Sequence, residues 1–343
     1  PLVDLVATIA LGLVIWFGGL NAMQGTLTLG VLIAFIQYAR QFFEPIRNLS
    51  DQFNTLQSAM AGAERIFDLL DSDLSISEEE SPVDFKTVDG RIEFRNVWFS
   101  YDPKIDSEDD EADWILRDVS FSVNPGQSLA IVGATGAGKS TVINLLLRFY
   151  DIQRGSILVD GVDITSISLA DLRSHIGLVL QDVFLFSGTI RDNITLRNDE
   201  ITDERMKRAA ASIGASAFIE RFSAQYDYEV RERGMSLSHG QRQLLSFVRA
   251  LVYAPRILVL DEATSSVDTE TEEAIQNALE RLMKDRTSVA IAHRLSTIQH
   301  ADKILVMHRG QVRESGSHQE LISQDGLYRK LYELQYQEQK ALA

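Results

Sequence analysis

The chain has 343 residues and a formal net charge of -16, so it is long enough for two or more domains and too acidic for a protein whose main partner is nucleic acid. Cysteine is absent, which excludes disulfides and thiolate-ligated metal sites. The charge is uneven. Residues 71–113 contain 15 acidic and four basic residues, as a solvated linker or loop does, whereas residues 5–39 contain no charged residue.

Two apolar stretches lie at the start of the chain. Residues 5–20 are close to the length of a bilayer crossing, residues 21–26 form a polar break, and residues 27–39 are apolar again. We therefore predict two transmembrane helices joined by a tight turn, in preference to a buried soluble hairpin. Arg40 and Arg47 predict that the second helix ends on the cytoplasmic side.

The helical pattern continues beyond the second apolar stretch. Apolar residues keep a three- and four-residue spacing to Leu70, and Pro45 need not end the helix. A helix over 29–70 would be roughly 60 Å long, about twice the bilayer core, and should extend into the cytoplasm. We expect residues 1–72 to form the membrane helices with this extension, and residues 73–90 an acidic linker. Because the chain starts at Pro1, we read it as the C-terminal part of a longer polypeptide or as a trimmed chain.

From residue 91 the chain has the pattern of an α/β domain. Residues 91–101 and 119–123 alternate as half-buried strands do, whereas residues 128–133, 257–260 and 288–293 are typical of fully buried strands. Residues 139–150 and 269–283 have helical patterns. This alternation predicts a parallel sheet covered by helices over 91–343, with residues 182–250 as an inserted helical subdomain.

A phosphate-binding loop is predicted at residues 133–141. The sequence GATGAGKST follows the predicted strand SLAIV and opens a predicted helix, which is the context that a P-loop requires. Glycines let backbone N–H groups approach phosphate oxygens, Lys139 can reach the β- and γ-phosphates, and Ser140 can ligate Mg²⁺. The candidate ATP-binding residues here are Gly133, Thr135, Gly136, Ala137, Gly138, Lys139, Ser140 and Thr141.

Two adjacent acids follow the buried strand ILVL. Asp261 and Glu262 would repel each other without a reason to be paired. If this strand lies in the same sheet as SLAIV, with its end beside the phosphate loop, Asp261 faces Mg²⁺ and Glu262 can orient the attacking water. The pair therefore predicts a nucleotide hydrolase that uses Mg²⁺, a property shared by many P-loop proteins.

The sequence LSHGQ at residues 237–241 resembles the signature of ATP-binding cassette (ABC) proteins, usually LSGGQ. Tyr101, Gln181, the SSVD sequence and His293 agree with this family in order and spacing over residues 91–343. The segments GTLTLGVLIAFIQYARQFFEPI and AERIFDLLD resemble the last two helices of ABC exporters. The resemblance implies an α-helical transmembrane segment fused to an α/β P-loop NTPase, an ABC-type nucleotide-binding domain with a helical subdomain.

The resemblance also implies roles for single residues. Tyr101 would stack on adenine, His293 would bond the γ-phosphate, and Gln181 would touch Mg²⁺ and the water. The loop of Gln181 would contact the membrane domain, and RERG (231–234) would sense it. Glu262, His293 and Gln181 are thus the catalytic candidates, and Ser140, Gln181 and Asp261 the metal ligands. The residues expected to bind the ATP of a partner subunit are Ser238, Gly240, Gln241 and Asp268.

Ser238 also has a physical reason to bind an anion. It occupies the N-cap position before a predicted helix, and Gly240 leaves the backbone open there. His239 stands where the family has glycine. Because heterodimeric exporters often carry one altered signature, a different partner chain stays open, although a homodimer is favoured.

These observations predict a half-transporter subunit in the cell membrane, with its nucleotide-binding domain in the cytoplasm. Its partners would be a second half-transporter, the lipid bilayer and a small or lipid-like substrate, but not nucleic acid. One alternative is a soluble-type ABC ATPase that acts on nucleic acid or ribosomes. The uncharged run 5–39 and the acidic charge argue against it. A second alternative, an ATP-gated channel or regulator, stays open.

Overall fold

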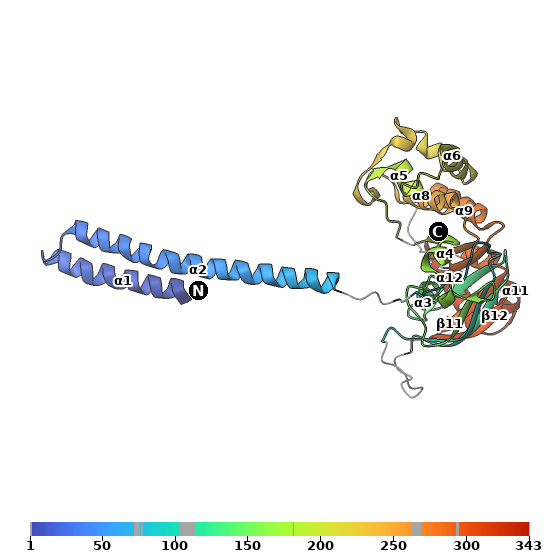
Figure 1. The fold of residues 1–343 in the computed structure, drawn as a ribbon, viewed down its shortest axis with the longest axis horizontal. Coiled ribbons are helices and arrows are strands. Elements are labelled where there is room, and N and C mark those ends of the chain that lie inside the picture. Colours follow the sequence, from blue (N-terminus) through green and yellow to red (C-terminus); the bar gives the residue numbers. More distant parts are fainter. Residues whose placement is uncertain are drawn as a thin grey trace. The chain divides into compact units, whose positions relative to one another are not determined.

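The chain folds as two compact units, Pro1–Leu74 and Ser75–Ala343, each with its own internal packing (Figure 1). The structure, a computed structural model, describes residues 2–71, 76, 78–102, 114–180, 182–261, 269–292 and 295–342.

The first unit is a hairpin of two helices. α1 spans Leu2–Met23 and α2 spans Leu29–Leu70, the bounds that the apolar periodicity predicts for α2. In the turn between them, Gly25 has a φ of +75°, a left-handed conformation that glycine adopts without strain. α2 continues through Pro45, as expected.

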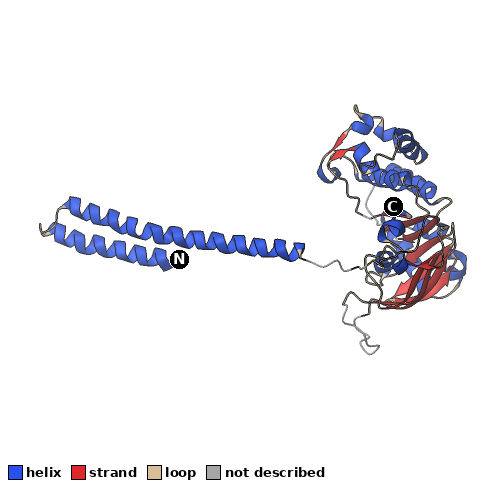
Figure 2. Ribbon diagram, viewed as in Figure 1, coloured by secondary structure: helices blue, strands red, loops and turns tan. Residues whose placement is uncertain are grey.

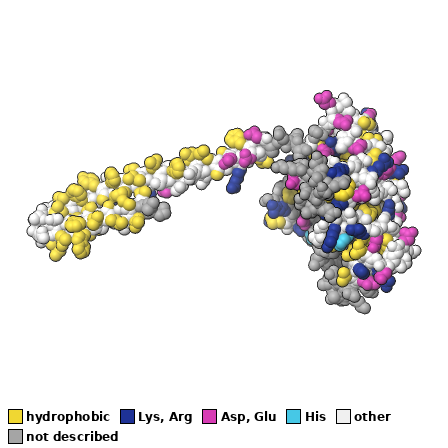
Figure 3. Space-filling view, turned by 90° about the horizontal axis from the view of Figure 1, so that it is seen from below, with side chains coloured by type: hydrophobic (Ala, Val, Ile, Leu, Met, Phe, Trp, Pro, Cys, Tyr) yellow, Lys and Arg dark blue, Asp and Glu magenta, His cyan; other side chains and the backbone are white. Residues whose placement is uncertain are grey.

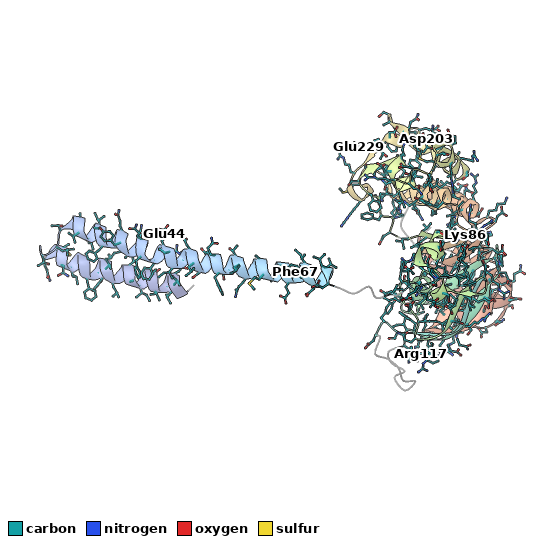
Figure 4. All side chains as sticks on the ribbon, in the orientation of Figure 1. Glu44, Phe67, Lys86, Arg117, Asp203 and Glu229 are labelled. Carbon is teal, nitrogen blue, oxygen red and sulfur yellow. The ribbon has the colours of Figure 1, made fainter. Side chains whose placement is uncertain are left out.

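Large apolar side chains are exposed along this hairpin (Figure 3). Val3–Met23 has a mean hydropathy of 2.0, and in the described part of the chain it is the one helix long and apolar enough to cross a membrane. Among the described helices α2, which we predicted to be a second span, is not such a helix. Arg40 and Glu44 follow its apolar stretch closely. Glu44 and Phe67 both project outward from α2 (Figure 4).

The second unit is built on a six-stranded sheet with the strand order β12-β11-β3-β10-β9-β6. All neighbouring strands pair in parallel except β11 and β12, so the predicted parallel sheet is confirmed with one antiparallel edge strand. The strands are β3 (Ser128–Val132), β6 (Ile176–Val179), β9 (Ile257–Asp261), β10 (Thr287–Ile291), β11 (Lys303–His308) and β12 (Gln311–Gly316).

A four-stranded antiparallel sheet with the order β2-β1-β4-β5 belongs to the same unit. Its strands are β1 (Ile92–Phe99), β2 (Leu116–Val123), β4 (Arg154–Val159) and β5 (Val162–Asp163). The rings of Phe94 and Phe121 face each other across β1 and β2 at 4.6 Å, and both are buried. This sheet and the six-stranded sheet share one hydrophobic core with α3 (Lys139–Leu146).

Residues 182–250 form a mostly helical region (Figure 2). A two-stranded hairpin, β7 (Gly188–Thr189) with β8 (Glu229–Val230), interrupts the helices. The helices are α5 (Ile190–Thr195), α6 (Asp203–Ser212), α7 (Ser216–Ile219) and α8 (His239–Val252). They share a second core with β6, β9 and α9 (Thr269–Met283), which attaches the region to the sheet.

The remaining helices are α4 (Leu169–Ser174), α10 (Leu295–His300), α11 (His318–Ser323) and α12 (Leu327–Leu342). Short 3₁₀ turns lie at Ile164–Ser166, Gln225–Asp227 and Glu232–Gly234. A third core, which includes Ile298, Leu321 and Tyr328, lies between α10, α11, α12 and the sheet.

The stretch predicted as an acidic linker, 73–90, is packed on the second unit in its last part. Val83 forms a bridge with Ile167, and Phe85 and Val88 are buried in the core of the two sheets. Each buried side chain of this size contributes about 1.5–3 kcal/mol relative to an exposed one. The sequence does not indicate that these apolar residues are buried, because they are few and widely spaced in an acidic stretch.

Candidate nucleotide-binding site

The candidate site residues follow the ends of four neighbouring parallel strands. The phosphate loop follows β3, His293 follows β10, Glu262 follows β9 and Gln181 follows β6. Because parallel strands end at one edge of a sheet, these segments of chain start from the same edge. Of these residues, Gln181, Glu262 and His293 lie outside the described residues, as does Asp268.

β10 lies between the two strands that carry the strongest motifs. Ile291 is opposite Ile131 of β3 on one side and Asp261 of β9 on the other. Two strand spacings place the backbones of Ile131 and Asp261 roughly 10 Å apart. The sequence correctly predicts that both strands belong to one sheet, and the structure adds that one strand separates them.

Three glycines shape the phosphate loop. Gly133, Gly136 and Gly138 have φ values of +154°, +79° and +96°. A Cβ atom on Gly133 would lie 2.3 Å from the backbone oxygen of Met307, and one on Gly138 would lie 2.7 Å from Leu116 Cδ2, whereas one on Gly136 would meet nothing within 4 Å. The outer glycines therefore let the loop pack against the protein, and the middle one faces open space.

The charge of Lys139 in this loop interacts with the charge of Asp261 at the end of β9. Lys139 as a whole is 8% exposed. Its ammonium group donates hydrogen bonds to the carbonyl oxygens of Gly133 at 2.7 Å and Ala134 at 3.1 Å. Burial lowers the pKa of Lys139 below its ordinary value, and the negative charge of Asp261 acts against this shift. The end of β9 thus lies close enough to the loop for the two charges to interact.

The other loop residues divide into exposed and buried ones. Thr135, Gly136 and Ser140 are exposed, whereas Ala137 and Thr141 are buried. The Ser140 hydroxyl is therefore available on the first turn of α3, and Thr141 packs toward the protein.

Tyr101 is held beside α3. Its hydroxyl lies 3.2 Å from the Thr141 hydroxyl, and Asn144 donates to it at 3.5 Å. Tyr101 is 47% exposed, and its ring contacts those of Phe99 and Tyr150 edge-on at centroid distances of 4.9 and 5.0 Å. The structure thus brings Tyr101 together with the phosphate helix and leaves part of the ring accessible to a flat ligand.

Ser238 caps α8, as its sequence position predicts. The Ser238 hydroxyl accepts a hydrogen bond from the Gln241 N–H at 3.2 Å, and the Ser238 N–H donates to Gln241 Oε1 at 2.9 Å. This reciprocal capping box fixes the start of a 14-residue helix. Ser238 and Gln241 therefore have a local structural role, the capping of α8. Gly240, between them in sequence, is buried.

Two arginines on α8 were not among the sequence candidates. Arg242 donates to the carbonyl oxygens of Gly234 and Leu237, which fixes the turn before the signature. Arg249 donates to the carbonyl oxygens of Asn193 and Phe184. The basic character of α8 is visible in the sequence, but no local pattern shows which carbonyl groups these side chains reach.

Magnesium fits the oxygen donors at this edge of the sheet. Ser140 offers an exposed hydroxyl and Asp261 a partly exposed carboxylate whose charge reaches the phosphate loop. Hard oxygen ligands of this kind are those that Mg²⁺ prefers, with phosphate and water supplying the rest. Within the described ranges there is no group of three or more His, Cys, Asp or Glu residues that could hold a metal without such help.

The family model described as "ABC transporter" matches residues 116–265, which include the phosphate loop, the signature and the acidic strand. These residues form an ABC transporter domain. The fold around them is the one that the motifs imply, with an N-terminal helical segment joined to a P-loop nucleotide-binding domain.

Curated relatives are ABC transporter proteins. The chain is 48% identical over 320 residues to "Uncharacterized ABC transporter ATP-binding protein YfiC" of Bacillus subtilis, covering 93% of this chain and 52% of that protein. It is 39% identical to "ATP-dependent lipid A-core flippase" of Syntrophus aciditrophicus, covering 99% and 55%. The chain thus spans about half the length of the curated relatives it matches.

A solved structure matches the same extent of chain. "Structure of a bacterial Atm1-family ABC exporter with ATP bound" has a TM-score of 0.71 and 37% identity, and covers 97% of this chain and 56% of that chain. The match therefore includes the helical hairpin as well as the nucleotide-binding domain.

Proposed function

We propose that this chain is part of an ATP-driven ABC exporter half-transporter that moves a small or lipid-like substrate across the cell membrane. One observation carries the proposal. A single chain combines a buried Lys139 at a glycine-shaped phosphate loop, the Asp261 charge beside it, and a capped signature helix. The relative named as a lipid A-core flippase supports a lipid-like substrate class.

Phosphate binding would use Lys139, whose ammonium group is hydrogen-bonded to carbonyl oxygens of the loop. The Lys139 ammonium is bonded to two loop carbonyl groups, and its buried charge is stabilised by anions. Nucleotide phosphates would take over these bonds and offset the desolvation of Lys139. Tyr101 would stack on the adenine ring with its accessible face.

Hydrolysis would use the acids and polar groups at the strand ends. Glu262 would orient or polarise the attacking water, Gln181 would contact that water, and His293 would bond the γ-phosphate. Ser140, Asp261 and Gln181 would hold Mg²⁺, which neutralises phosphate charge when it is bound.

A second copy or a related chain would complete each site. Ser238, Gly240, Gln241 and Asp268 would close over the nucleotide of the partner, because a helix start with free N–H groups attracts phosphate. Closure would move the membrane helices and hydrolysis would reset them. Arg40 and Arg47 support a cytoplasmic location for the nucleotide-binding domain.

The test is the ATPase activity of the protein purified from membranes in detergent. Lys139→Ala should abolish ATP binding, and Glu262→Gln should bind ATP but hydrolyse it at least about 100-fold more slowly, since general-base assistance contributes about that much or more. Lys303→Ala is the matched control, because Lys303 bonds the Ser122 carbonyl away from the site. Wild-type turnover in Glu262→Gln would remove the assignment of Glu262, and an inactive wild-type protein would contradict the proposal as a whole.

A further inference from the structure

Arg249 and Asn193 form a hydrogen-bonded cluster between α8, α5 and the loop 182–187. Arg249 Nε donates to the Asn193 carbonyl oxygen at 2.8 Å, and Arg249 Nη1 donates to the Phe184 carbonyl oxygen at 3.2 Å. A third donor, Nη2, lies 3.4 Å from Asn193 Oδ1. One guanidinium group thus bonds both a helix and the loop.

Asn193 fastens the same loop from the other side. Asn193 is 1% exposed. Its Oδ1 accepts from the Phe186 N–H at 2.8 Å, and its Nδ2 donates to the carbonyl oxygens of Phe186 and Thr189 at 2.9 and 3.0 Å. A buried amide that uses both its donors and its acceptor in this way holds its neighbours in one geometry.

The loop that they fasten presents two aromatic rings. Phe184 and Phe186 are 51% and 55% exposed, and their rings meet edge-on at 5.0 Å. The loop starts directly after Gln181, and α8 starts directly after Ser238. The cluster is therefore a physical connection between two segments that carry predicted site residues.

We propose that Arg249 and Asn193 are positioning residues that fix the loop 182–187 to the signature helix, so that the two move as one body during ATP turnover. Arginine suits this role because its planar group makes several directed bonds at once, which a lysine cannot reproduce. The inference rests on the proposed function for its kinetic consequence, but the connection itself does not depend on it.

Two variants and one matched control test the proposal. Arg249→Lys keeps the charge but loses most of the bonds, and Asn193→Ala frees the loop from α5. Tyr253→Phe is the control, because the Tyr253 hydroxyl also joins α8 to α5, through the Thr195 carbonyl oxygen at 2.6 Å, without touching the loop. The first measurement is amide hydrogen exchange over residues 182–187 in the purified protein, which requires no activity.

We expect faster exchange in this loop for Arg249→Lys and Asn193→Ala, and unchanged exchange for Tyr253→Phe. In steady-state ATPase assays, the two variants should lower kcat about five- to tenfold, the equivalent of one lost hydrogen bond, with the KM for ATP within about twofold of wild type. Tyr253→Phe should lower the thermal midpoint but keep kcat.

Unchanged loop exchange in both variants would overturn the proposal, and so would equal losses of kcat in Arg249→Lys and Tyr253→Phe, because the effect would then be general destabilisation. If the wild-type protein shows no ATPase activity, the proposed function fails, whereas the exchange data still decide whether the connection exists.

Discussion

Single residues in the phosphate loop differ in what constrains them. Gly133 is confined by the Met307 carbonyl oxygen, 2.3 Å from where a Cβ would lie, and Gly136 is constrained by its φ of +79° alone. The sequence motif does not distinguish between these two glycines. Packing against β11 distinguishes Gly133, where the fold leaves no room for a side chain, from Gly136, where only the backbone conformation favours glycine.

Gly133→Ala should therefore destabilise the second unit more than Gly136→Ala. We expect Gly136→Ala to cost about 1–2 kcal/mol for the left-handed backbone, and Gly133→Ala about 2 kcal/mol more, because the backbone at Met307 must move. Urea unfolding followed by tryptophan fluorescence measures both. Gly161→Ala, at a φ of +81° in open space, is the reference. Equal midpoints for Gly133→Ala and Gly161→Ala would contradict the steric argument.

Tyr101 allows its ring and its hydroxyl to be tested separately. Tyr101→Phe removes only the hydroxyl contacts with Thr141 and Asn144, so we expect ATP affinity to change by less than about threefold. Tyr101→Leu removes the ring, and the loss of base stacking should weaken binding by about tenfold or more. Titration with a fluorescent ATP analogue gives both values. Wild-type affinity in Tyr101→Leu would show that adenine is bound elsewhere.

At the scale of elements, two of the described helices begin with a capping box whose first residue is serine. Ser238 with Gln241 caps α8, and Ser317 with Glu320 caps α11. Ser238→Ala and Ser317→Ala should each destabilise the protein by about 1 kcal/mol, because each loses one cap. Only Ser238→Ala should also lower kcat, if α8 binds a nucleotide in addition to being capped.

Thermal unfolding and ATPase assays on the pair separate the two roles of Ser238. Ser317→Ala is the control, because it removes a helix cap at a position where no nucleotide is proposed to bind. If both variants lose the same fraction of activity, the role of Ser238 is structural only.

The start of α5 should respond to acid. The Thr189 N–H donates to Asp192, and this bond holds the pKa of Asp192 below its ordinary value. A carboxylate with a lowered pKa stabilises the folded state above the ordinary pKa of Asp, and the stabilisation is lost as the pH falls through the folded value. Wild type should exceed Asp192→Asn in stability by less than about 1 kcal/mol at pH 7, since the site is partly solvated.

This difference should shrink below about pH 4. Amide exchange of residues 189–192 in both proteins from pH 7 to pH 3, corrected for the intrinsic rate, measures it locally. A difference that stays constant over this range would mean that the charge of Asp192 does not stabilise α5.

For the whole molecule, the proposal of shared sites predicts complementation between inactive chains. Lys139→Ala disables the phosphate loop, and Ser238→Glu places a carboxylate where phosphate would bind. If each site combines the loop of one chain with the signature of the other, a mixed dimer retains one intact site. Co-expression should then restore about a quarter of wild-type ATPase activity, because about half of the dimers are mixed and each has one of two sites.

Separately purified variants that are mixed only after assembly provide the control, since their subunits cannot exchange freely. If neither the co-expressed nor the separately purified variants show activity together, the phosphate loop and the signature of one nucleotide site lie on the same chain.

The sequence by itself determined the chemistry of the phosphate loop, the cap at Ser238 and the extent of α2. These features depend on residues within a few positions of one another, so spacing and side-chain type are sufficient to predict them. Lys139 and Ser140 are recognisable because strand, glycine loop and helix follow each other directly in the chain.

Only the tertiary structure decided how distant segments meet. β10 lies between β3 and β9, Asp261 acts on the charge of Lys139, and Arg249 reaches Asn193 and Phe184. It likewise buried Phe85 and Val88 in a stretch that composition predicts to be a linker. Strand order and the burial of single side chains depend on the summed packing of many residues far apart in sequence, which no local pattern contains.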